Sequence, residues 1–350
     1  MTTIPKKTNL TAIKTILAIF VFTSHAHILA GIDYLDFLNS IDIETRVQSF
    51  FVISGFFVFL SYDNRKSVKQ FLRRRFERLY PPYAVAVIFC TLIGIAFTTA
   101  HRDFQLYQDA GKYLIANITT LNFIHPSILG AFADNKISAI NGALWTMKIE
   151  FMFYLSVPLI YLMGKKIGHI RSLVLLLIAS AIYAYICSYL YISTENELFT
   201  LLRRQLPGQI QFFAAGAILY RLMIGENFEY VKGDIALIIV ASVCTIVTLN
   251  KLPVIYPISL SIAVVGLIFS KSLGSWNKFG DLSFGIYLYH FPIIQSFVQF
   301  GWFEKNPTIG LAAAGASTLA AALLSCHFVE NSPWKIINPS KQKMGKITNA

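Results

Sequence analysis

The chain has 350 residues, of which 55% are hydrophobic and only 14% charged, and its mean hydropathy is +0.57. Soluble domains carry about 25% charged residues, so this composition excludes an ordinary soluble globular protein. Lysine and arginine (30) outnumber aspartate and glutamate (18), giving a net charge of +12. In a membrane protein this excess reflects topology, and we expect no nucleic-acid partner.

Ten apolar stretches are each compatible with a membrane-spanning helix. They cover residues 10–29, 46–62, 81–99, 144–163, 172–192, 208–224, 235–249, 254–270, 282–300 and 308–329. When successive loops are placed on alternate sides, most lysines and arginines fall on the side of the N-terminus, which predicts cytoplasmic termini and an even number of spans. The sequence therefore predicts an all-α polytopic bundle of about ten transmembrane helices in residues 1–334, followed by a short basic cytoplasmic tail, 335–350.

Three ionisable residues lie in the first predicted helix: Lys14, His25 and His27. Such residues are costly in a bilayer and are candidates for function. Lys14 and His25 are eleven residues apart, so they share one helix face and are separated by about 16 Å along the axis. His27 points away from that face. This face suits an elongated anionic ligand that enters from the cytosol, although a snorkelling lysine and a packed histidine would fit equally well.

The next long segment, 100–143, is expected outside as an ordered re-entrant or interfacial element, because it is too long and too rich in aliphatic and aromatic residues for a simple loop. The following helix carries Glu150 and, four residues later on the same side, Tyr154. A buried carboxylate here would either orient the histidine or pair with Lys148 or an arginine. The second reading is favoured by this segment alone.

Basic residues flank two other spans. A cytosolic run, 69–78, ends at Arg78, which is well placed to point inward, although such a run is also a topogenic signal. Arg203 precedes the sixth span and is either an interface anchor or a donor to sugar hydroxyls. The four cysteines lie in apolar stretches without ligand spacing, so we expect neither disulfides nor a metal site.

Five pieces of sequence in this order resemble acyltransferase family 3, membrane proteins that acylate sugars and other acceptors with acyl-CoA. They are Ser24-His25-Ala26, the run 50–57 around Ser54-Gly55, the run Phe71 to Pro81, Leu144-Trp145-Thr146 with Glu150 and Tyr154, and Gly280 to His290. The family pattern in the first helix is an arginine, ten residues and a histidine. Lys14 takes the arginine position here, which keeps the charge but loses the bidentate fork.

The resemblance implies an O-acyltransferase, most simply an O-acetyltransferase, of the bacterial cytoplasmic (inner) membrane. Acetyl-CoA would be its co-substrate, without a bound cofactor, and the acceptor would be a polysaccharide, a lipopolysaccharide or a lipid-linked glycan precursor. His25 would be the general base, helped by Glu150, and Lys14 and Arg78 would bind the donor. A covalent acyl-histidine is the alternative mechanism. Candidate cavity-lining residues are Ser54, Trp145, Tyr154, Arg203, Tyr287 and His290.

Other functions are less well supported by the sequence. A secondary transporter or permease would also place charges within the membrane, but no internal repeat is evident. Ser54 and Gly55 favour close helix packing over nucleophilic catalysis, and no GxSxG elbow is present. His290 fits a packing role better than a catalytic one.

Overall fold

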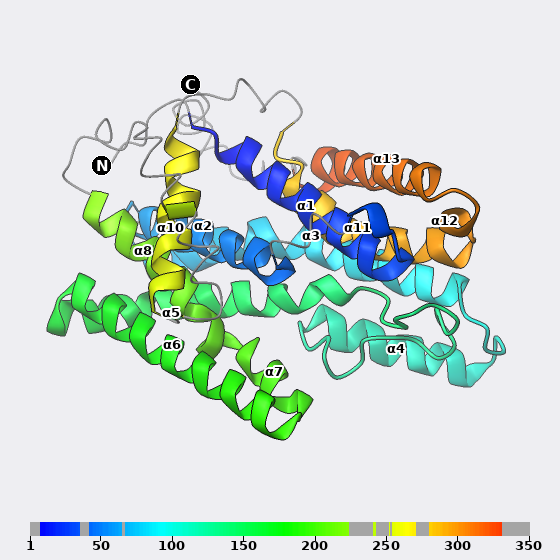
Figure 1. Cartoon of the computed structure of the whole chain (residues 1–350), viewed down its shortest axis with the longest axis horizontal. Coiled ribbons are helices and arrows are strands. Elements are labelled where there is room, and N and C mark those ends of the chain that lie inside the picture. The colour runs from blue at the N-terminus through cyan, green and yellow to red at the C-terminus, as the bar shows by residue number, and fades with distance from the viewer. Residues whose placement is uncertain are drawn as a thin grey trace.

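The computed structural model describes residues 8–35, 42–64, 67–223, 241–242, 252, 254–270 and 280–330. Within these ranges the chain is mostly α-helical, and β-type pairing there is limited to an isolated bridge between Thr98 and Ala131. The helices lie against one another as a bundle (Figure 1). The predicted all-α class is therefore confirmed.

The helices differ widely in length, from short connecting turns to a 29-residue helix. They are α1 (Leu10–Ala30), α2 (Ile43–Asp63), α3 (Val68–Ala96), α4 (Phe104–Ile118), η2 (Gly142–Leu144), α5 (Trp145–Ile167), α6 (His169–Thr194), α7 (Glu197–Arg203), α8 (Leu206–Met223), α10 (Ile255–Phe269), α11 (Ser283–Gln299), α12 (Trp302–Lys305), α13 (Pro307–Ser325) and the π-helical turn η5 (Cys326–Glu330).

Six of these segments are long and apolar enough to cross a membrane: Leu10–Ala30, Ile43–Asp63, Val68–Ala96, Gly142–Ile167, His169–Thr194 and Pro307–Glu330. The shorter helices α8, α10 and α11 coincide with three further predicted spans. The predicted span 235–249 lies outside the described residues except for 241–242. A membrane-embedded helical bundle is thus confirmed, whereas the count of ten crossings and the side of the termini stay predictions.

The third span begins earlier than predicted. The sequence places its start at Pro81, but α3 runs from Val68 through Pro81 and Pro82, and the side chain of Ser67 accepts a hydrogen bond from Gln70 N at its first turn. Proline removes one backbone hydrogen bond and is tolerated within helices that are supported by neighbours. The basic run 69–78 is therefore part of α3 rather than of a loop before it.

The segment between α3 and α5 is ordered, as predicted. The helix α4 packs along α3 (Figure 1), and the hydroxyl of Tyr83 in α3 donates to the backbone carbonyl of Asn117 near the end of α4. Tyr83 lies 13 residues before the end of α3, a distance of about 20 Å. The helix α4 therefore extends well back along α3 before the chain returns to the bridge at Ala131.

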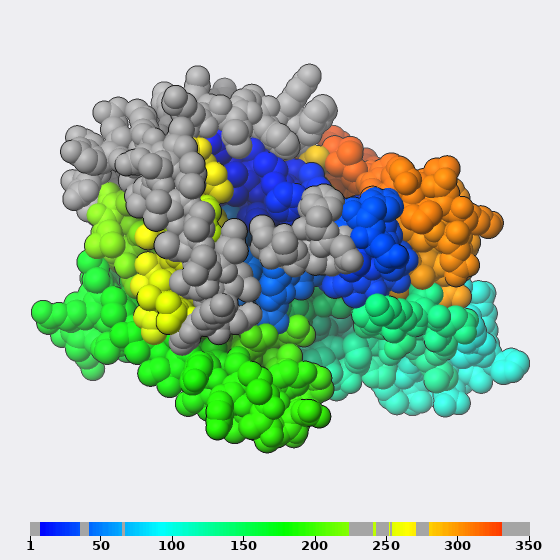
Figure 2. Space-filling model, viewed as in Figure 1, coloured from blue at the N-terminus to red at the C-terminus, as the bar shows by residue number. Residues whose placement is uncertain are grey.

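Large apolar side chains cover the outside of the bundle. On α6, which runs along the lower edge of the molecule in Figure 2, Tyr189 is 62% and Ile192 78% exposed. On α5, Leu155 and Leu159 are similarly exposed. A soluble monomer rarely exposes so much contiguous apolar surface, whereas the hydrocarbon of a bilayer would cover it.

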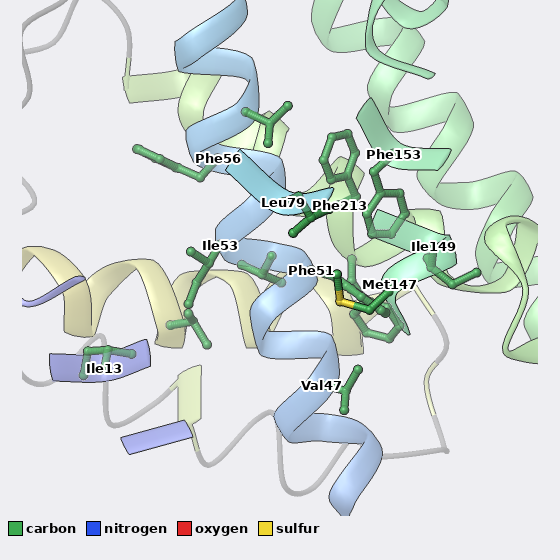
Figure 3. Packing of buried hydrophobic residues seen from close by; sticks show 14 of the residues in the cluster. Ile13, Val47, Phe51, Ile53, Phe56, Leu79, Met147, Ile149, Phe153 and Phe213 are labelled. Atoms are coloured by element: carbon green, nitrogen blue, oxygen red, sulfur yellow. The ribbon is translucent and has the colours of Figure 1, made fainter. Parts of the chain in front are cut away.

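The helices α2 and α8 cross with their backbones in contact. A Cβ atom on Gly55 would lie 2.0 Å from the carbonyl oxygen of Phe213, and one on Gly216 would lie 2.1 Å from that of Val52. Small residues allow this close approach, as predicted for Gly55. Beside the crossing, Phe153 of α5 stacks on Phe213 at 4.5 Å, within the apolar core shown in Figure 3.

Candidate active site

A cavity of about 360 Å³ lies between α1, α2, α3, α5 and α11. Its walls are apolar at many positions, with Phe51, Phe57 and Leu79 among them, but polar side chains project into it from every one of these helices. These polar residues include Lys14, Ser54, Arg75, Arg78, Glu150, Tyr154, Asp281 and Tyr287. Six of the predicted site residues therefore line the same cavity: Lys14, Ser54, Arg78, Glu150, Tyr154 and Tyr287.

Basic side chains gather at one end of the cavity. Lys14 of α1 forms an ion pair with Asp281, and Arg78 of α3 lies 3.9 Å from the same carboxylate. Asp281 also accepts from the backbone N–H of Ser283 at 3.3 Å, at the start of α11. Arg75 lies over the ring of Tyr154, 5.6 Å from its centroid. The lining of the whole cavity holds three basic residues, Lys14, Arg75 and Arg78, and three acidic ones, Glu150, Asp281 and Glu330.

Asp281 remains a carboxylate in this setting. Burial by itself would raise the pKa of Asp281, but the charge of Lys14 and hydrogen bonds from Lys14 and Ser283 outweigh it and hold the pKa below its ordinary value. Lys14 and Asp281 thus form an ion pair in the cavity lining.

Glu150 occupies the middle of the cavity wall. Its Oε1 accepts a 2.5 Å hydrogen bond from the hydroxyl of Ser54, and Tyr154 also hydrogen-bonds to the carboxylate. The sequence left Lys148 open as a partner, but Lys148 Nζ donates to Gln205 Oε1 at 2.8 Å. The structure places Glu150 with Ser54 and Tyr154 rather than with His25.

His25 is not among the residues that line the cavity, but it lies close to one of them. That lining residue is Tyr287, whose hydroxyl is 2.8 Å from that of Thr146. His290 follows Tyr287 by almost one turn of α11, and its Nε2 lies 2.9 Å from Nδ1 of His25. Lys14 and His25 both face the α11 segment, as the eleven-residue spacing predicts. His27 does not share their contact, because its Nδ1 lies 2.9 Å from the carbonyl oxygen of Ile32.

Three predicted lining residues lie outside the cavity: Arg203, Trp145 and His290. Arg203 forms an ion pair of 2.9 Å with Glu44, which also pairs with Arg204 at 2.9 Å. The guanidinium of Arg204 covers the ring of Trp145 at 5.8 Å. Arg203 does not line the cavity because Glu44, at the start of α2, forms ion pairs with both Arg203 and Arg204. His290 also lies outside the lining and contacts His25 instead.

Sequence reasoning missed Arg75 and Asp281 as members of the site. The spacing of Arg75, Arg78 and Leu79 on one face of a helix was a usable signal, but it appears only once the basic run is recognised as helical. Asp281 lies within the run Gly280 to His290 that resembles the family, but the sequence does not show that it pairs with Lys14, because the two residues lie far apart in the chain.

Comparison with known proteins identifies the family. The family model described as an acyltransferase domain matches residues 7–327, nearly the whole chain. The chain belongs to acyltransferase family 3. This membership, together with the apolar helices, makes the protein a membrane acyltransferase and removes the main support for a permease.

Curated relatives agree with this assignment. This acyltransferase is 24% identical over 306 residues to Nodulation protein 10 of Rhizobium leguminosarum bv. viciae, a match that covers 83% of this chain and 82% of the relative. It is 28% identical over 123 residues to Acyltransferase MdmB of Streptomyces mycarofaciens, covering 35% of this chain and 29% of MdmB. No solved structure matches the chain.

Proposed function

We propose that this acyltransferase transfers an acyl group, most simply acetyl, from acyl-CoA to a hydroxyl of a cell-surface glycan or its lipid-linked precursor at the bacterial cytoplasmic membrane. One observation carries the proposal: a cavity lined by Lys14, Arg75 and Arg78 is also lined by Tyr287, three residues before the histidine that contacts His25. A thioester donor with an anionic head and a reactive far end matches this polarity.

The basic end suits the phosphates of coenzyme A. Lys14 and Arg78 flank Asp281, and Arg75 lies nearby on the same face of α3. Charge-assisted hydrogen bonds from such groups are the usual means of holding phosphate. Lys14 is eleven residues from His25, so a donor anchored there must extend about 16 Å along α1.

The middle of the cavity suits the polar arm of the donor. This arm carries amide groups, and Glu150, supported by Ser54 and Tyr154, offers acceptor oxygens along the path. In this proposal Glu150 positions the donor, and its catalytic contribution is indirect. This modifies the expectation that Glu150 assists His25 directly.

His25 acts as general base on the acceptor hydroxyl. The oxygen attacks the thioester carbonyl as His25 takes the hydroxyl proton, and a tetrahedral intermediate forms. When this intermediate collapses, the carbon–sulfur bond breaks and His25 returns the proton to the departing thiolate. The products are the acyl ester and free coenzyme A. Proton transfer by a positioned base contributes about 10²–10⁴-fold to such rates.

The test uses inside-out membrane vesicles from a strain that expresses the full chain, supplied with radiolabelled acetyl-CoA. Label should enter the glycan or lipid-linked fraction with the wild type and fall at least about 100-fold with His25→Ala. His27→Ala is the matched control on the same helix and should retain incorporation. Wild-type incorporation by His25→Ala at equal protein level would refute the assignment of the base.

The acceptor is identified separately. Mass spectrometry of surface glycans from strains with and without the gene should show a mass difference of one acyl group per modified unit. The size of that difference also separates acetyl from longer acyl groups. Identical glycan masses in the two strains would contradict a glycan acceptor.

A further inference from the structure

The protonation of His290 can be read from its contacts. Its Nδ1 lies 2.9 Å from the carbonyl oxygen of Tyr287 and 3.1 Å from that of Ile286, both in its own helix. Carbonyl oxygens only accept hydrogen bonds, so Nδ1 of His290 must carry a hydrogen. In the neutral ring, the remaining nitrogen, Nε2, is then an acceptor.

That acceptor faces His25. His290 Nε2 and His25 Nδ1 are 2.9 Å apart, the distance of a normal hydrogen bond. Because Nε2 of His290 has a lone pair and no hydrogen, the hydrogen between the rings belongs to Nδ1 of His25. The neutral His25 ring then has its lone pair on Nε2, since only one of its two nitrogens carries a hydrogen.

We propose that His290 is a positioning residue that fixes His25 in the Nδ1–H tautomer and thereby leaves Nε2 of His25 as the nitrogen that takes the acceptor's proton. This inference rests on the proposed role of His25 as general base. It assigns to His290 the task that a carboxylate performs in a serine hydrolase triad, where the partner holds the base in the correct tautomer and orientation.

The surroundings make this arrangement rigid. His290 is fully buried, and its ring is held by two backbone carbonyls and by His25. The ring of His25 also packs edge-on against Phe291, with centroids 5.1 Å apart. Glu150 is hydrogen-bonded to Ser54 and Tyr154. The partners of His25 are His290 of α11 and the backbone of Val21 in its own helix.

His290 does not carry the proton onward. Its Nδ1–H points at carbonyl oxygens, which are poor proton acceptors, so no outlet is available on that side. The proton that His25 takes on Nε2 therefore leaves by the same nitrogen, to the thiolate of coenzyme A. Throughout the cycle the Nδ1–H of His25 stays bonded to His290.

A kinetic test compares two substitutions at position 290. His290→Leu removes the acceptor at similar volume and should lower kcat by about 10²–10⁴-fold with little change in the KM for acetyl-CoA. His290→Gln places an oxygen acceptor opposite His25 Nδ1 and should recover most of the lost kcat. His27→Gln is the control for a histidine-to-glutamine change on α1. A kcat of His290→Leu within about twofold of wild type would overturn the inference.

A spectroscopic test on the wild type does not depend on a variant folding. The full chain is labelled with ¹⁵N-histidine in nanodiscs, and the His25 signals are assigned by their loss in His25→Gln. We expect Nδ1 of His25 to resonate as a protonated nitrogen and Nε2 as an unprotonated one. The reverse assignment would overturn the inference even if His25→Ala is inactive, and an active His25→Ala would instead refute the proposed function.

Discussion

Removing the charge of Asp281 should strengthen donor binding. In the structure Asp281 holds Lys14 in an ion pair and lies 3.9 Å from Arg78, the two side chains proposed to receive the donor's phosphates. A phosphate at this end must share these cations with a carboxylate that repels it. Asp281→Asn removes the repulsion but keeps an oxygen that can accept from Ser283 at the start of α11.

The size of the effect follows from Coulomb's law. Two unit charges about 5 Å apart interact by about 1 kcal/mol in water and about 3 kcal/mol at an effective dielectric constant of 20. The side chains of Asp281 and Arg78 are 31% and 63% exposed, so solvent screening favours the lower value. We therefore expect acetyl-CoA to bind Asp281→Asn about fivefold more tightly than the wild type.

The assay is calorimetric titration of the protein in nanodiscs with acetyl-CoA at low and high salt. The gain should shrink at high salt, where exposed charges are screened. Asp63→Asn is the matched control, because Asp63 pairs with Arg221 at 2.9 Å outside the cavity lining, and its donor affinity should not change. Weaker or equal binding by Asp281→Asn, with an unchanged melting temperature, would refute the reasoning.

The same pair sets a pH expectation. The pKa of Asp281 lies below its ordinary value, so its ion pair stabilises the fold at pH values above that ordinary value and is lost only as the pH falls through the lowered pKa. From about pH 6 to 8 Asp281 therefore stays a carboxylate. Wild-type donor affinity should not change through titration of Asp281 over this range, and Asp281→Asn should keep its advantage across it.

Three further predictions concern the donor end and the fold. Lys14→Arg should retain acetyl-CoA affinity, whereas Lys14→Ala should weaken it about tenfold through the loss of one charge-assisted contact. An unchanged affinity of Lys14→Ala, measured by calorimetry, would show that Lys14 does not bind the donor. Gly55→Ala should lower the free energy of unfolding by about 1–3 kcal/mol, since its Cβ would lie 2.0 Å from Phe213 O. Gly111→Ala is the control and should leave it unchanged, because its Cβ would meet nothing within 4 Å. Equal melting temperatures for the two variants would contradict the packing argument. Glu44→Gln removes the carboxylate that Arg203 and Arg204 share and should lower the free energy of unfolding by about 1–3 kcal/mol, with a smaller loss at high salt. A melting temperature equal to that of the wild type would show that the two ion pairs do not stabilise the fold.

Much of the fold is predictable from the sequence because bilayer hydrocarbon requires long apolar helices. The apolar runs located nine of the ten proposed spans to within a few residues at most ends. The start of α3 was the main error. Pro81 normally marks a helix boundary, and its tolerance within α3 depends on packing that the sequence does not display.

The site was predictable from the sequence where the geometry of a single helix fixes the relative positions of two residues. The spacing of Lys14 and His25 places both on one face of α1 without any knowledge of other helices. Partners across helices were not predictable in the same way. Asp281 beside Lys14, Glu44 beside Arg203 and His290 beside His25 are separated by more than 150 residues in sequence, and only tertiary packing brings each pair together.

The crossing of α2 and α8 also determines how the cavity can admit a substrate. Ser54 and Gly55 are neighbours, one directed to Glu150 and the other pressed against the backbone of α8. Because the backbones of α2 and α8 are in contact at Gly55 and Gly216, rotation or translation of α2 against α8 would bring Gly55 too close to the carbonyl oxygen of Phe213. Lys14 lies on α1 and Asp281 just before α11, so any widening of the cavity that moves α1 away from α11 would also part Lys14 from Asp281.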